Sequence, residues 1–278
     1  MLNNTVIEIR IQVSLCQAML FILLATVTLM LSSGAVSASS TITNWSYFVQ
    51  DDPKIWRLLE KEYHLCDSGI NQSSTNINGS YLSNLFTLGF NYSGVPLQIV
   101  NNSHAIKINY NTTVDHEKFT IEIANKRYHL PSVISYGRSI IISGEKYRLL
   151  QVYFNNPNEH YLASKPYAME AHFVHANSVG QLAVVDGFFK SDKNNKFIDS
   201  LWHQMPRNTD GIHVNNSIHL NAENLLPENK NYYHYRDSLT TSACSEGVRW
   251  FDMRNVVKVS SSQIVKFLSV INENAHPV

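Results

Sequence analysis

Histidine and cysteine are the residue types of this chain with the widest chemical repertoire, and the sequence contains 12 histidines and 3 cysteines. Imidazole titrates near neutral pH and binds metals through a neutral nitrogen, so these histidines could add a modest positive charge in mild acid or hold an ion. His172 lies within Met169 to His175, a segment that we expect to form a strand. A lone histidine on a strand is by default a structural residue, and that interpretation of His172 comes first.

The cysteines indicate one disulfide. Cys16 lies in a hydrophobic N-terminal segment, and removal of that segment would leave Cys66 and Cys244. An even pair in an exported chain favours a disulfide. On the chain-entropy model, closing so long a loop contributes about 5 kcal/mol of stability. The alternative is two free, buried thiols.

Residues 1–38 have the features of a signal peptide. Arg10 precedes an apolar stretch from Ala18 to Leu31, and Val36-Ser37-Ala38 matches a signal-peptidase site. We therefore expect an exported protein, periplasmic or secreted, with no membrane span after cleavage. The alternative is a retained anchor, because the apolar stretch approaches spanning length.

The remaining residues, 39–278, are expected to form one domain, since no repeat or linker divides them. The whole chain has 22 basic and 22 acidic residues and a formal net charge of +0. This balance gives no excess of basic residues of the kind that nucleic-acid-binding proteins carry, so we expect no nucleic-acid partner.

The hydrophobic pattern predicts a mainly β fold with short peripheral helices. Two helices are expected, one carrying Phe197, Ile198, Leu201 and Met205, the other starting at a capping box formed by Ser260 and Gln263. The expected strands alternate apolar and polar residues or form apolar runs next to turns. They are Phe119–Ile123, the hairpin arms Ile140–Ile142 and Tyr147–Phe154, Met169–His175 and Gln181–Phe189.

Several segments, in order, resemble the bacterial-type α-carbonic anhydrases over nearly all of residues 39–278. They are Trp45-Ser46-Tyr47 with Pro53 and Trp56, Cys66 with Asn71–Ile77, Asn101–His104, Glu159-His160 with Tyr167–His175, and Ser238–Thr241 with Cys244–Trp250. The resemblance implies the α-carbonic anhydrase fold, a large, twisted, mostly antiparallel central sheet with short peripheral helices. It also implies zinc-dependent, reversible hydration of carbon dioxide to bicarbonate.

The resemblance places the three zinc-ligand positions on Tyr153, Asn155 and His172, so only one histidine is retained. In a strand, residues i and i+2 point to the same face, so Tyr153 and Asn155 should face the cleft, while Val152 and Phe154 should face the core. A neutral amide is a poor zinc ligand, and a phenol must first lose a proton whose pKa is about 10. We therefore expect zinc to be absent or weakly bound.

The same resemblance assigns roles to the surrounding positions. Gln151 and Glu170 would orient the ligands; Glu159, Thr240 and His104 would act in catalysis, with His104 as the proton shuttle; Val174, Val184 and Leu239 would form the carbon dioxide pocket. Each also has an ordinary structural interpretation, as core, sheet hydrogen bonding or a surface histidine.

Two functions therefore remain open. The first is a weakly active or inactive family member, a non-catalytic binding or scaffold domain whose partner is an unknown ligand or protein. The second is a functional carbonic anhydrase with an altered zinc site, acting on carbon dioxide and bicarbonate.

Overall fold

The computed structural model describes residues 45–47, 53–79, 86–110, 117–123, 126–132 and 138–276, with side chains outside 117–132. The expected signal peptide, residues 1–38, lies outside this part. The strands are β1 (Asn76–Ile77), β2 (Leu88–Tyr92), β3 (Val95–Asn101), β4 (Ile106–Asn109), β5 (Glu117–Ile123), β6 (Lys126–Ser132), β7 (Arg138–Ile142), β8 (Glu145–Asn155), β9 (Tyr161–Leu162), β10 (Met169–Ala176), β11 (Leu182–Ser191), β12 (Ile212–Leu220), β13 (Tyr232–Asp237), β14 (Val248–Met253) and β15 (Val257–Val259).

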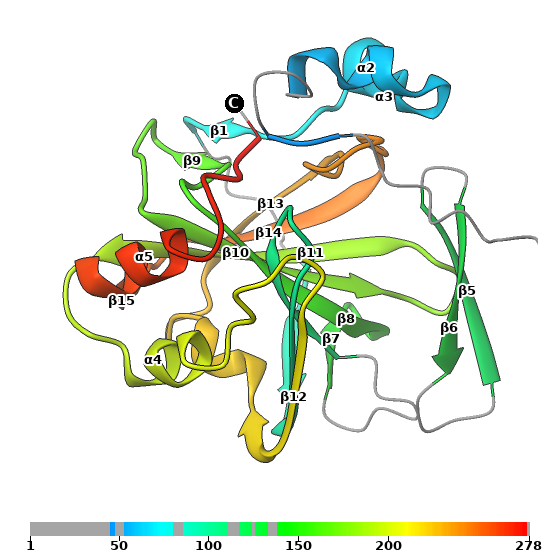
Figure 1. Cartoon of the computed structure of the whole chain (residues 1–278). Coiled ribbons are helices and arrows are strands. Elements are labelled where there is room, and N and C mark those ends of the chain that lie inside the picture. Colours follow the sequence, from blue (N-terminus) through cyan, green and yellow to red (C-terminus); the bar gives the residue numbers. More distant parts are fainter. Residues whose placement is uncertain are drawn as a thin grey trace, which may run out of the picture. The chain divides into compact units, whose positions relative to one another are not determined.

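The dominant element is an 11-stranded sheet with the order β12-β3-β4-β8-β10-β11-β14-β13 (Figure 1). β15 pairs with β11, while β2 and β7 extend the sheet from the first half of the long strand β8. Pairing is antiparallel except where β11 meets β14 and β15. β5 and β6 form a separate hairpin, and β1 pairs with β9. The predicted mainly β fold with a large, mostly antiparallel sheet is confirmed.

The helices are short and peripheral, as predicted. They are η1 (Pro53–Ile55), α2 (Trp56–Leu59), η2 (Lys61–Tyr63), α3 (Leu65–Ser68), α4 (Lys196–Trp202), η3 (Ala222–Leu225) and α5 (Ser261–Leu268). The capping box before α5 is present, with Ser260 and Gln263 each bonding the other's backbone. Met205 lies beyond the end of α4. Among the described residues, no helix combines the length and the apolar character needed to cross a bilayer.

The central sheet buries both of its faces, because successive side chains of a strand point in opposite directions. On one face, Val152, Phe154 and Phe173 join the main core, to which α4 and α5 also contribute. On the other, Tyr153 and Val174 belong to a second apolar cluster. We call this second face the site face. The expected orientation of β8, with Val152 and Phe154 toward the core and Tyr153 on the other side, is confirmed.

The predicted disulfide is also present. Cys66 and Cys244 are bonded across a sequence separation of 178 residues. Cys244 packs in a third cluster with Trp56 and Tyr63, which ties the N-terminal helices to the loop after β13. The alternative of two free thiols is therefore excluded.

Candidate functional site

Four polar side chains form a row across the site face, one on each of four neighbouring strands. The pairing register places Tyr153 on β8 opposite His172 on β10, His172 opposite Asp186 on β11, and Asp186 opposite Asp252 on β14. Tyr153 is 6% exposed, and the other three are fully buried. Because each strand is continuous and paired on both sides here, the backbone fixes which side chains meet.

His172 uses both ring nitrogens. Its Nε2 contacts a carboxylate oxygen of Glu170, and its Nδ1 lies 2.7 Å from the phenolic oxygen of Tyr153. A carboxylate accepts hydrogen bonds, so Nε2 carries the proton and Nδ1 accepts from the Tyr153 hydroxyl. Burial lowers the pKa of His172, which keeps the ring neutral, although Glu170 acts in the opposite direction. Both ring nitrogens of His172 therefore have hydrogen-bond partners in this structure.

Tyr153 stays a phenol at neutral pH. Burial raises its pKa well above the ordinary value, and the nearby charge of Glu159 adds to the effect. Its oxygen also lies 3.5 Å from the Thr240 hydroxyl. Asn155, two residues further along the strand, is fully buried, and its carbonyl oxygen accepts from the Asn274 amide at 3.3 Å.

Glu159 and Thr240 are brought next to Tyr153 and His172. A carboxylate oxygen of Glu159 lies 3.7 Å from His172 Nδ1, and the other accepts the backbone N–H of His276 at 2.7 Å. Burial and then the neighbouring Glu170 raise the Glu159 pKa to about 8, while hydrogen bonds from Thr240 and His276 partly offset this.

Glu170 connects the strand to the loop that follows β8. One oxygen accepts the backbone N–H groups of Glu159 and His160 at 2.7 and 2.9 Å, and the other lies 2.7 Å from His160 Nδ1. Burial favours the neutral carboxyl, but the charge of His160 and the hydrogen bonds from His160 and His172 outweigh it and lower the Glu170 pKa. Burial likewise opposes a charge on His160, yet Glu170 raises the His160 pKa to about 9.

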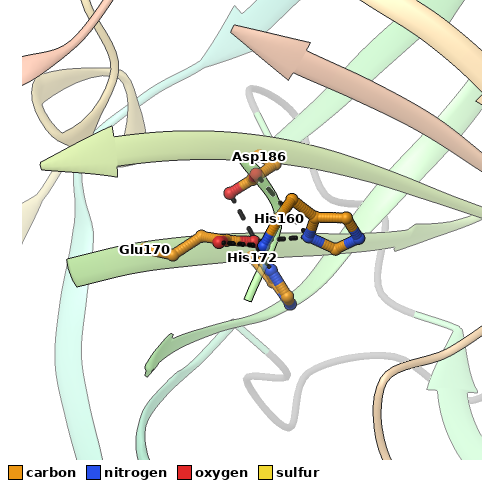
Figure 2. Close-up of side chains that lie close together, drawn as sticks. All are labelled: His160, Glu170, His172 and Asp186. Atoms are coloured by element: carbon orange, nitrogen blue, oxygen red, sulfur yellow. Dashed lines mark hydrogen bonds and ion pairs between the residues drawn. The ribbon is translucent and has the colours of Figure 1, made fainter. Parts of the chain in front are cut away.

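Asp186 completes a cluster that sequence reasoning missed. Figure 2 shows His160, Glu170, His172 and Asp186 pointing toward one another, and one ligand atom from each lies within 4.8 Å of the others. Burial and then Glu170 raise the pKa of Asp186 well above its ordinary value. The sequence did contain one indication that Asp186 belongs to a site, because it is the single acidic residue inside the apolar run Leu182–Phe189. His160 was noted only as part of a motif.

The expected apolar pocket residues lie together. Val174, Val184 and Leu239 share one cluster with Val248 and Trp250. Gln151 lies on the same strand face as Tyr153 and pairs with Val174 in register. His104 is half-buried after β3 and stacks on Trp45 at 4.1 Å between ring centroids. Burial, and then the charge of Lys107, lower the pKa of His104.

The donor set at the three expected zinc-ligand positions does not fit zinc. A phenol, an amide and one imidazole meet there, and the hydrogen bond from Tyr153 already uses the free nitrogen of His172. Zinc sites in proteins use thiolates, imidazoles and carboxylates as ligands. Zinc at this position would have to displace the Tyr153 hydroxyl.

Comparison with known proteins assigns the chain to a family. The family model described as eukaryotic-type carbonic anhydrase matches residues 51–277. Carbonic anhydrases of Neisseria gonorrhoeae and Klebsiella pneumoniae are 30% and 32% identical, covering 91% and 85% of this chain and 92% and 87% of theirs. The solved α-carbonic anhydrase of Thermovibrio ammonificans, in complex with sulfanilamide, is 32% identical with a TM-score of 0.71, covering 85% of this chain and 95% of that one. The chain belongs to the α-carbonic anhydrase family.

Proposed function

We propose that this chain does not hydrate carbon dioxide and serves as a non-catalytic binding domain on the carbonic anhydrase fold. The observation that carries the proposal is the 2.7 Å contact between the Tyr153 hydroxyl and His172 Nδ1. His172 is the one histidine left at the family's ligand positions, and this contact occupies its one ring nitrogen that does not face Glu170. A phenol that stays protonated cannot replace an imidazole as a zinc ligand.

The loss of zinc at this position removes the main source of catalysis. Zinc lowers the pKa of its bound water from about 15.7 to about 7, which supplies hydroxide at neutral pH. A difference of nearly nine pKa units corresponds to roughly 12 kcal/mol. The retained Glu159, Thr240 and apolar pocket could orient a hydroxide and carbon dioxide, but no side chain at these positions would generate the hydroxide.

The proposal includes export from the cell. The Cys66–Cys244 disulfide and the bacterial relatives support it, since disulfides persist in oxidising compartments. Residues 1–38 would be removed as a signal peptide, leaving residues 39–278 as the mature domain. N-terminal sequencing of the exported protein tests this, and a terminus upstream of Ser39 would contradict it.

Stopped-flow measurement of carbon dioxide hydration tests the proposed loss of activity. The full chain is assayed with added zinc, with and without a sulfonamide inhibitor, beside an active carbonic anhydrase. The expected rate is that of buffer in both cases. A sulfonamide-sensitive rate would favour the second function, a working enzyme with an altered zinc site.

A further inference from the structure

One carboxyl group of the site face is buried without a hydrogen-bond partner among the described residues. Asp186 is fully buried, and neither of its oxygens has a hydrogen-bond partner. Its nearest basic atoms are His172 Nε2 at 3.8 Å and His160 Nδ1 at 4.0 Å. These distances are too long for hydrogen bonds. A buried carboxyl group without a hydrogen-bond partner is unfavourable, so this arrangement points to a ligand between these groups.

The charges around Asp186 also favour a bound ligand, and specifically a cation. Glu170 and Asp186 are both fully buried. In the part of the chain that the structure describes, the ion pairs of these two carboxylates involve only His160 and His172. A divalent cation would balance both carboxylates while leaving both imidazoles neutral, which is the form that binds metals.

The spacing of the donor atoms is that of a small coordination shell. A tetrahedral zinc ion with bonds of about 2.0–2.1 Å places neighbouring donor atoms roughly 3.3 Å apart. The Asp186 contacts are wider than this, with one oxygen 3.8 Å from His172 Nε2 and the other 4.0 Å from His160 Nδ1, while the contacts of Glu170 with the two histidines are closer. One ligand atom from each of the four side chains lies within 4.8 Å of the others. Side-chain movements of about 1.5 Å or less, the difference between 4.8 Å and the tetrahedral spacing, would therefore bring the four donor atoms to one ion.

We propose that His160, Glu170, His172 and Asp186 bind one divalent transition-metal ion, with zinc as the best match. Two imidazole nitrogens and two carboxylate oxygens are a donor set that zinc accepts in tetrahedral geometry. All four side chains are fully buried, so the shell is closed and the ion is structural. The inference goes beyond the proposed function and does not depend on it.

This ion differs in position from the family zinc, because it uses Nε2 of His172 instead of Nδ1. Binding displaces the protons now held by Nε2 of His172 and Nδ1 of His160, and releases them to solvent. The remaining proton of His172 then resides on Nδ1 and is donated to the Tyr153 oxygen, 2.7 Å away. A metal-bound histidine characteristically donates its second N–H to an oxygen in this way.

Metal analysis of the full chain tests the proposal. The protein is stripped with dipicolinate during unfolding, refolded with or without zinc, desalted, and analysed by inductively coupled plasma mass spectrometry. About one zinc per chain and a higher melting temperature than the zinc-free sample are expected. Asp186→Asn, which keeps the shape but removes a ligand charge, should lower occupancy at least about tenfold and abolish the melting shift.

Two matched variants locate the ion. Asp252→Asn changes the next buried acid of the row and should keep the zinc, whereas Tyr153→Phe removes the oxygen that receives the second N–H of His172 and should weaken zinc binding without abolishing it. X-ray absorption of the zinc-loaded wild type should show two imidazoles and no sulfur, a result that holds even if a variant fails to fold. Less than about 0.1 zinc per wild-type chain, or undiminished zinc in folded Asp186→Asn, would overturn the proposal. Sulfonamide-sensitive hydration, in contrast, would contradict only the proposed function.

Discussion

Tyr153 and His172 face each other directly across β8 and β10, and the Tyr153 hydroxyl lies 2.7 Å from His172 Nδ1. The antiparallel register would place a histidine at position 153 within reach of the same ion as His172. A tyrosine there reaches the imidazole itself. On the proposed assignment of the ligand positions, Tyr153 replaces one ligand, and its hydroxyl occupies the ligand that remains.

Rebuilding the ligands should restore a zinc site. In Tyr153→His with Asn155→His, positions i and i+2 aim two rings to the site face beside His172, with Glu170 already in contact with His172. We predict that the double variant binds zinc with higher affinity than the wild type, measured by competition with a chelator.

The single variants are the controls for this rescue. Tyr153→His or Asn155→His alone leaves two imidazoles and one poor ligand, so each should gain far less affinity. An unchanged zinc affinity in the double variant would show that the surroundings of the site have diverged together with its ligands.

The disulfide should contribute substantially to stability. Cys66 and Cys244 close a loop of 178 residues, and the chain-entropy model gives about 5 kcal/mol for such a loop. Cys66→Ser with Cys244→Ser should lower the free energy of unfolding by up to this amount in urea titrations. Equal midpoints for the variant and the oxidised wild type would contradict the prediction.

Asn274 should be important for anchoring the C-terminal segment beneath the site. Its amide nitrogen donates to the carbonyls of His104 and Phe154 at 2.9 and 3.0 Å, and its carbonyl oxygen accepts the N–H of Asn156 at 3.0 Å. Each buried group left unpaired costs about 1–3 kcal/mol, so Asn274→Ala should destabilise by roughly 3 kcal/mol. Thermal unfolding measures this, with the exposed Asn272→Ala as the near-neutral control. Equal losses in both variants would refute it.

Stability should fall as the pH rises above neutrality in metal-free protein. Burial raises the pKa of Glu159 from 4.5 to about 8, so the folded state holds its proton over a range where the unfolded chain does not. His160, whose pKa is raised to about 9, acts in the same direction above pH 6.5. The lowered pKa values of His172 and His175 add stability only as the pH rises toward 6.5.

From pH 6.5 to 8, Glu159 alone should therefore reduce the free energy of unfolding by roughly 2 kcal/mol, at about 1.4 kcal/mol per pH unit. Urea titrations across this range measure the slope, and Glu159→Gln should make it shallower. A free energy of unfolding that stays constant or rises from pH 6.5 to 8 would contradict the raised pKa of Glu159.

Local pattern was sufficient to predict much of the sheet. The alternation in β8 correctly placed Val152 and Phe154 in the core and Tyr153 on the opposite face, because side-chain direction in a strand depends only on parity. The capping box of Ser260 and Gln263 was equally local.

The partners across the sheet were not predictable in this way. Asp186 meets His172 and Asp252 only through the register of β11 with β10 and β14, and 56 residues lie between the end of β11 and the start of β14. The anchoring role of Asn274 likewise depends on where a C-terminal segment folds back. The hydrogen-bond partners of Tyr153 and His172 could be found only from the coordinates, because the resemblance predicts which positions face the site but not which side chains meet there.

The central claim is that the cleft lacks a zinc hydroxide because its ligand positions hold Tyr153 and Asn155. The most direct test is the sulfonamide-sensitive rate of carbon dioxide hydration, measured by stopped flow on the wild type and the double histidine variant, both saturated with zinc. The account predicts a wild-type rate equal to that of buffer and a measurable, inhibitor-sensitive rate in the variant. An inhibitor-sensitive rate in the wild type itself would contradict it.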